Sequence, residues 1–162
     1  MSDAWQIDTR RVAERGERIE RQLTAAQLPR LRKECVNRFE PVQVSLHGLF
    51  TPYDKPGVRV ALQADLRVPC QRCLKPLPVA LALTCAFEWV ATEAELELRD
   101  EDDEWDAVLA AEQIDLLPLL EDELLLALPF APTHAACKPA VAFEAGEKVS
   151  PFAALAGLKA PK

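Results

Sequence analysis

Two long runs of the chain alternate between apolar and polar residues, one over 58–68 and the other over 78–90. Alternation with a period of two is typical of a β-strand that buries one of its faces. A short segment, 70–78, joins the two runs and opens with the motif Cys70-Gln71-Arg72-Cys73. The pattern therefore predicts a long β-hairpin that carries two cysteines at its tip.

The N-terminal part of the chain predicts shorter elements. Asp8 is suited to cap a helix over 10–15, and a short strand is expected over 19–23. A helical stretch over 25–35 contains Pro29, which lacks an N–H group and clashes with the preceding turn of a helix. This helix therefore either begins late or kinks at the proline.

The stretches on either side of the hairpin differ in character. Apolar and polar residues alternate over 42–46, which predicts another strand, and a loop rich in proline and glycine is expected over 48–57. Residues 91–113 are acidic and show no periodicity, so we expect an irregular acidic loop there.

A leucine-rich segment predicts a helix over 116–127, with Asp115 as its cap and Leu128-Pro129 at its end. Leucines at spacings of three and four give this helix one apolar face, and these are Leu117, Leu120 and Leu124. The acidic residues between them, Glu121, Asp122 and Glu123, are expected to form a solvated polar patch.

The end of the chain has little periodicity over 130–150, where we expect a flexible segment, and Ser150-Pro151 is suited to open a short helix to about 157. Strands that look antiparallel, with helices near both ends of the chain, indicate an α+β fold. We expect one domain over 1–162, with an antiparallel sheet built on a long central hairpin and flanked by short N-terminal and C-terminal helices.

Charge is distributed unevenly along the chain, whose net charge is −7. Residues 1–39 hold nine basic against six acidic side chains, whereas residues 88–123 hold fifteen acidic side chains and one basic one. An acidic stretch repels phosphate, so a purely electrostatic nucleic-acid binder is disfavoured. With neither an apolar run near roughly 18 residues nor an apolar leader, we expect a cytoplasmic protein with reduced thiols and no membrane partner.

The cysteine pair at the predicted tip has three interpretations: a metal site, a redox pair, or thiols that only shape the turn. His134 and Cys137 lie three residues apart and, together with Cys70 and Cys73, provide the four ligands of a tetrahedral zinc site. A redox pair is less favoured, because such a motif normally opens a helix, whereas a strand follows here.

Other candidates for chemistry are sparse. His47 falls on the polar face of a predicted strand, and Cys35 and Cys85 are predicted to be structural thiols. The sequence has no phosphate-binding loop and no nucleophile elbow, so we expect no enzymatic activity.

Basic residues near the tip are candidates for contact with RNA or with a protein partner. Arg72 and Lys75 flank the cysteines, and Arg59 and Arg67 share the polar face of the first hairpin strand. Scattered solubilising charge explains these residues about equally well, and no group of stacking aromatic residues accompanies them.

Three segments, taken in order, resemble a known bacterial family. Residues 70–76 resemble its Cys-x-Arg-Cys hairpin, and residues 114–129 resemble its acidic, leucine-rich helix that ends in Leu-Pro. Residues 150–159 resemble its C-terminal Asn-Pro-Phe-x-x-Leu-x-x-Leu-Lys tail, with Ser150 in place of asparagine. The order and spacing of the three are similar to those of the YceD family, also called the DUF177 family.

This resemblance implies a non-enzymatic role in the synthesis, processing or stability of 23S ribosomal RNA. It implies 23S rRNA or its precursor, or a large-subunit assembly protein, as the partner, and no DNA. Family members often carry a second cysteine pair after the Leu-Pro helix, where this chain has His134 and Cys137, and histidine can replace cysteine as a zinc ligand. The alternatives are a zinc-ribbon-like adaptor that binds protein without touching RNA, and a thiol-dependent enzyme.

Overall fold

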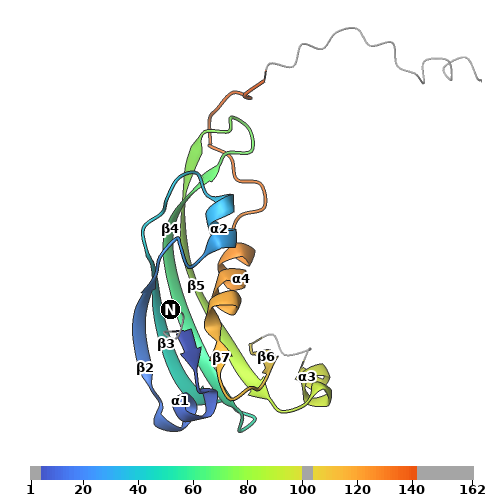
Figure 1. Cartoon of the computed structure of the whole chain (residues 1–162). Helices are drawn as coiled ribbons and strands as arrows, with labels where there is room; N and C mark the ends of the chain where they lie inside the picture. Colours follow the sequence, from blue (N-terminus) through green and yellow to red (C-terminus); the bar gives the residue numbers. More distant parts are fainter. Residues whose placement is uncertain (1–4, 100–103, 142–162) are drawn as a thin grey trace, which may run out of the picture.

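The computed structural model of the chain describes residues 5–99 and 104–141 (Figure 1). Its main feature is a curved five-stranded sheet with the strand order β2-β3-β4-β5-β6. The strands are β2 (Arg18–Leu23), β3 (Val42–Phe50), β4 (Pro56–Pro69), β5 (Pro76–Val90) and β6 (Asp106–Leu109). Neighbouring strands are antiparallel except β5 and β6, which run parallel. A small second sheet pairs β1 (Gln6–Ile7) with β7 (Ile114–Asp115).

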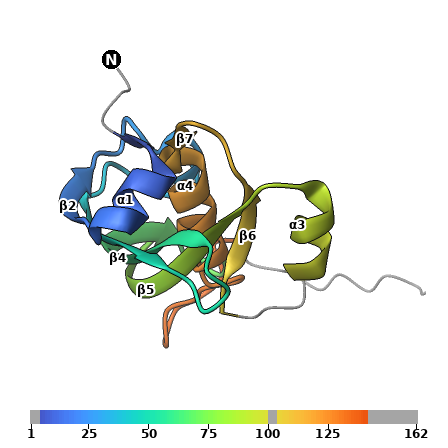
Figure 2. The ribbon, with the colours of Figure 1, turned by 90° about the horizontal axis from the view of Figure 1, so that it is seen from below.

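The helices of the described chain are α1 (Thr9–Arg15), α2 (Pro29–Glu34), α3 (Glu93–Arg99) and α4 (Leu116–Leu126). Figure 1 shows α2 and α4 on one face of the sheet and α1 at its lower end, while Figure 2 shows α3 standing to the side, beyond β6. The predicted α+β class is confirmed, with a mixed sheet in place of a purely antiparallel one.

The predicted hairpin is present as β4 and β5, paired from Gly57↔Glu88 to Pro69↔Pro76. Apolar and polar residues alternate along β4, so one face of the strand turns toward the core. The side chains on one face of β4 are buried, and they are Val58, Val60, Leu62, Ala64, Leu66 and Val68. All of them except Val68 belong to the same apolar core as the buried leucines of α4, which are Leu116, Leu120 and Leu124. The core therefore lies between one face of the sheet and the helices above it.

Local chemistry explains where the short elements begin and end. The Asp8 carboxylate accepts the backbone N–H of Arg11 at 2.9 Å and caps α1, as predicted. Helix α2 begins late, with Pro29 in its first turn, where a missing N–H group costs no helical hydrogen bond. The predicted cap of α4 is also confirmed, because the Asp115 carboxylate accepts the Leu117 N–H at 3.0 Å.

Two predictions about loops are wrong. The loop expected over 48–57 is shorter, because β3 continues to Phe50 and β4 starts at Pro56. Gly48 lies within β3 and passes close to α1, where a Cβ at this position would collide with the Val12 carbonyl oxygen. The acidic stretch over 91–113 is not irregular throughout, since it contains α3 and β6.

The acidic stretch is held in place by contacts with residues from other parts of the chain. Trp105 is 3 % exposed, and the Arg59 guanidinium lies 5.3 Å from the centre of its ring. The Arg99 Nε lies 3.2 Å from a carboxylate oxygen of Glu88, which is fully buried in β5. These two contacts attach β6 and α3 to the sheet, and periodicity within the segment does not reveal them.

The polar patch expected on α4 is also partly wrong, because Glu121 is only 4 % exposed. Its Oε1 accepts the backbone N–H groups of Arg30 at 2.6 Å and Leu31 at 3.0 Å, and its Oε2 accepts Nε of Arg30 at 2.9 Å. A buried carboxylate is tolerated when it is paired and hydrogen-bonded in this way. Glu121 therefore ties α4 to the first turn of α2.

Candidate metal centre at the hairpin tip

The turn between β4 and β5 forms the first half of the site. The Cys70 N–H donates to the Lys75 carbonyl at 2.9 Å, and the Leu74 N–H donates to the Cys70 carbonyl at 2.9 Å. Leu74 has a φ of 60°, a left-handed conformation that is uncommon for a residue other than glycine. The chain thus folds tightly back on itself and places Cys73 beside Cys70.

The segment that follows α4 supplies the second half. The Gln71 N–H donates to the Pro132 carbonyl at 2.8 Å, and the Ala140 N–H donates to the Arg72 carbonyl at 3.0 Å. Figure 1 shows this segment leaving α4 and running up to the tip of the hairpin. Residues 130–141, the described part of the segment expected to be flexible, therefore include two backbone contacts with the turn.

The four predicted metal ligands come together at this place. The ligand atoms of Cys70, Cys73, His134 and Cys137 all lie within 4.8 Å of one another. The Cys70 and Cys137 sulfurs are 3.8 Å apart, and the Cys73 sulfur lies 3.4 Å from Nδ1 of His134. Cys70 is buried and the other three are half-buried.

These separations fit one tetrahedral zinc ion. Zinc binds sulfur at about 2.3 Å and imidazole nitrogen at about 2.0 Å, so the edges of its tetrahedron are about 3.8 Å between sulfurs and about 3.5 Å between sulfur and nitrogen. The spacings of 3.8 and 3.4 Å match both edges. Four protein ligands also complete the usual coordination of a structural zinc and leave no position open for a substrate.

The surroundings of Cys70 favour the thiolate that a metal requires. Burial opposes the charge, but the backbone N–H groups of Cys73, His134 and Arg72 outweigh it and lower the pKa of Cys70 to about 5. The His134 N–H lies 3.4 Å from the Cys70 sulfur. In contrast, burial and the neighbouring thiols of Cys70 and Cys73 raise the pKa of Cys137, because the ligands repel one another's negative charge. A bound cation relieves this repulsion.

The four basic residues singled out in the sequence do not form one patch. Arg72 and Lys75 are exposed on the tip, and Arg67 is exposed near the end of β4. Arg59 lies on the same strand but about 36 Å from Cys70, at roughly 3.3 Å per residue. Its Nη2 is 2.8 Å from a carboxylate oxygen of Glu104, and its guanidinium covers Trp105. Only Arg67, Arg72 and Lys75 therefore belong to the tip end of the hairpin.

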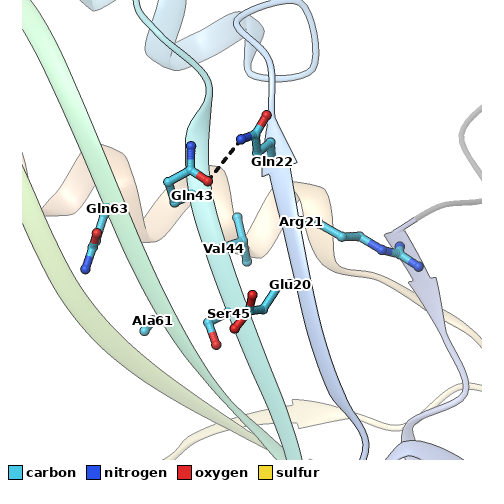
Figure 3. Close-up of a pocket in the computed structure, with 8 residues that line it drawn as sticks. All are labelled: Glu20, Arg21, Gln22, Gln43, Val44, Ser45, Ala61 and Gln63. Carbon is cyan, nitrogen blue, oxygen red and sulfur yellow. Dashed lines mark hydrogen bonds between the residues drawn. The ribbon is translucent and has the colours of Figure 1, made fainter.

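A separate depression of about 500 Å³ lies on the outer face of β2, β3 and β4 (Figure 3). Its lining consists of Glu20, Arg21, Gln22, Gln43, Val44, Ser45, Ala61 and Gln63. Figure 3 shows Gln22 beside Gln43, and the Gln22 amide donates to the Gln43 amide oxygen at 3.2 Å. The lining contains no cysteine or histidine, so this depression is unrelated to the Cys/His cluster.

The sequence predicts the four residues that cluster at the tip, but it gives no indication of Glu121, Glu88 and the acidic pair of Asp106 and Glu123. Asp106 and Glu123 line one depression beside β5. No local signal separates these residues from solvated acids, because their neighbours come from distant parts of the chain.

The tail motif at 150–159 and the short helix expected from Pro151 lie outside the described residues. Within the described residues, no helix combines the length and apolar character needed to cross a bilayer.

The fold and the cluster define a small α+β protein with a Cys₃His centre at the tip of a long hairpin. The sequence model of one family, described as "Large ribosomal RNA subunit accumulation protein YceD", matches residues 58–159, which include most of the hairpin and all four residues of the Cys/His cluster. A curated protein of the same description from Haemophilus influenzae is 32% identical over 145 residues, which is 83% of each chain. The chain therefore belongs to the YceD family. No solved structure matches it.

Proposed function

We propose that the protein is a non-enzymatic ribosome-biogenesis factor that promotes the synthesis, processing or stability of 23S rRNA. Membership of a family named for accumulation of the large ribosomal RNA carries the proposal. The Cys/His centre adds a physical reason to place the working surface at the hairpin tip. Its four ligands join two segments more than sixty residues apart in sequence, and basic side chains project around them.

We assign zinc to this centre, with a structural role. The donor set of three sulfurs and one nitrogen suits zinc, and the Cys70–Cys137 and Cys73–His134 separations agree with two edges of its tetrahedron. When bound, the ion fixes the turn against residues 132–140 and thereby fixes the backbone that carries Arg72 and Lys75. Rigid presentation lowers the ordering cost of binding a partner.

The charges at the tip favour RNA as the partner of this surface. Arg72, Lys75 and Lys138 are exposed within the two segments that the centre joins, and Arg67 is exposed nearby on β4. Basic side chains bind phosphates, mainly through the release of condensed counterions. The described residues over 91–115, by contrast, are strongly acidic and lie toward the opposite end of the sheet, so we expect RNA to contact one end of the molecule only.

Deletion of the gene tests the role in the cell. We expect the ratio of 23S to 16S rRNA to fall, and the wild-type gene to restore it. The variant Arg72→Ala/Lys75→Ala should restore it poorly. A control that removes two exposed basic residues far from the tip, Arg10→Ala/Arg18→Ala, should restore it fully. An unchanged ratio in the deletion strain contradicts the proposed function.

Salt dependence tests direct contact with RNA. Each phosphate contact on a single strand contributes about 0.7 to the slope of log K against log salt, so the double variant at the tip should lower this slope by about 1.4. Binding to 23S fragments that is independent of salt, or absent, instead supports the second candidate function. That candidate is an adaptor that binds only protein, and the acidic surface of the lower half of the molecule favours it.

A further inference from the structure

Strand β5 has an open edge along most of its length. It runs over Pro76–Val90, and β4 pairs with all but its last two residues. On its other side, β6 pairs only with residues 87–90. Figure 1 shows β6 beside only the lower part of β5. Within 5–99 and 104–141, no strand pairs with residues 76–86 on this side.

The register shows which backbone groups this edge presents. The Cys70 N–H bonds the carbonyl of Lys75, the residue directly opposite, and the same register continues along β4 and β5. Odd-numbered residues of β5 therefore bond to β4, and even-numbered residues direct their N–H and C=O groups outward. The even-numbered Val90 follows this rule, because its carbonyl points outward and accepts the Ala110 N–H at 2.8 Å on the β6 side. Ala80, Ala82 and Thr84 thus present backbone groups that no strand of the described chain pairs with.

The open edge lacks the usual protection against strand addition. Residues 76–87 contain no charged side chain, although natural edge strands are commonly guarded by lysine, proline or a bulge. Pro76 and Pro78 stand at outward-facing positions, where their missing N–H groups cost no bond to β4. These prolines block strand addition only at the tip end of β5. Residues 79–86 are left as a neutral edge of the kind to which an extended peptide adds as a further strand.

An acidic depression lies at the lower end of this open edge. It has a volume of about 530 Å³ and is lined by Arg59, Thr84, Cys85, Ala86, Glu104, Asp106 and Glu123. Its one cation, Arg59, is already paired with Glu104. Burial and the nearby carboxylates of Asp106 and Asp122 raise the pKa of Glu123. A positive side chain entering the depression therefore relieves an existing repulsion.

We propose that residues 79–86 of β5 pair with an extended segment of a basic protein, whose lysine or arginine enters the depression beside Asp106 and Glu123. The choice of partner rests on the proposed function, because proteins that assemble on rRNA carry basic residues for its phosphates. RNA is disfavoured at this edge, since the carboxylates repel phosphate. The molecule then holds RNA at the tip and a basic protein along β5.

A synthetic probe and two proline variants test the proposal in the full chain. The probe is a labelled nonapeptide that alternates valine and lysine, and its counterparts carry glutamate for lysine or N-methyl groups on alternate amides. Ala82→Pro removes an outward N–H from β5. Gln22→Pro is the matched control, because the same register reasoning places the Gln22 N–H outward on β2, the opposite edge of the sheet.

We expect the lysine probe to bind and both counterparts to bind about tenfold more weakly, as lost hydrogen bonds and charge pairing require. Ala82→Pro and Asp106→Asn/Glu123→Gln should weaken binding similarly, whereas Gln22→Pro should leave it within about twofold. The N-methylated probe tests the edge without altering the protein, should Ala82→Pro fail to fold.

Three results overturn the proposal: no binding of the lysine probe, equal binding of the N-methylated probe, or equal loss of binding in the two proline variants. A dimer of the wild type that Ala82→Pro dissociates also overturns it, since a second copy then occupies the edge. None of these results affects binding of rRNA fragments at the tip, so a failure here is distinguishable from a failure of the proposed function.

Discussion

The two ends of the hairpin are stabilised by different means. The body, defined as the described residues within 5–68 and 77–128, has a continuous apolar core of sheet and helix side chains. The tip, defined as residues 70–75 and 132–140, has Cys70 as its only buried side chain among these residues. Segments this small bury too little apolar surface to fix one conformation, and in our proposal zinc ligation takes the place of the missing core.

This difference makes the two regions separately observable. All three tryptophans, Trp5, Trp89 and Trp105, are buried in the body. Tryptophan emission therefore reports on the body, while hydrogen exchange over 70–75 and 132–140 reports on the tip. Together the two signals separate an effect on the body from an effect on the tip.

Truncation of a core leucine should have the largest effect. Leu120 is fully buried between α4 and the sheet, so Leu120→Ala should lower the free energy of unfolding by about 2–5 kcal/mol. Urea titration followed by tryptophan emission measures the change. The control is Leu126→Ala, whose side chain is 80% exposed and whose cost should stay within about 0.5 kcal/mol. Equal costs for the two variants contradict the assigned core.

Removal of the buried carboxylate on α4 should have a smaller effect. Glu121→Ala leaves the buried N–H of Leu31 without its acceptor, so we expect a loss of about 1–3 kcal/mol in the same titration. The neighbouring carboxylate provides the control, because Asp122 is half exposed and Asp122→Ala should cost about 1 kcal/mol or less. A neutral Glu121→Ala variant contradicts the role of Glu121 in joining α2 to α4.

Alkaline pH should weaken the body through Cys85. Burial, with smaller contributions from Glu123 and Asp106, raises the pKa of Cys85 to about 12, above the value of about 8.5 in an unfolded chain. A raised pKa means that the folded state holds this proton more tightly. Its contribution to stability is therefore complete below about pH 8.5 and is lost as the pH rises toward 12.

The variant Cys85→Ala isolates this contribution. The free energy of unfolding should fall less steeply between pH 9 and 12 in Cys85→Ala than in the wild type, although the variant is less stable at neutral pH. Cys35→Ala is a weaker comparison of the same kind, because burial also raises the pKa of Cys35. Identical slopes in the wild type and Cys85→Ala rule out this cause.

Chelation should have the smallest effect on the body. Because the apolar core does not involve the four ligands, removal of the metal at 25 °C should leave tryptophan emission unchanged, while amide exchange at the tip accelerates. Isolated zinc fingers behave differently, since they unfold without their metal. Loss of tryptophan burial on chelation contradicts the separation of tip and body.

The sequence predicts the hairpin of the body better than it predicts Glu121 and β6, because the hairpin depends on a local pattern and the other two depend on contacts far apart in the chain. Alternation along β4 and β5 is local, and it specifies both the hairpin and its buried face. Glu121 was misassigned because its partners lie about 90 positions away in α2. The strand β6 was missed because its order depends on parallel pairing with β5, which four residues of its own sequence do not encode.

The candidate site was predictable in its ligands but not in its setting. The spacing of cysteine and histidine predicted which four residues come together, because coordination chemistry restricts both residue type and number. The hydrogen bonds of Gln71 and Arg72 to residues 132–140, which align the two halves, have no sequence signature. The open edge of β5 was equally hidden, since it exists only because β6 is short.

Metal analysis of the purified protein tests most directly the central claim, that a zinc centre orders the tip. We predict about one zinc per chain in the wild type and in Cys35→Ser, whose thiol lies outside the cluster, and loss of zinc in Cys73→Ser. Absence of zinc from the wild type, or equal zinc in Cys73→Ser and Cys35→Ser, contradicts the claim.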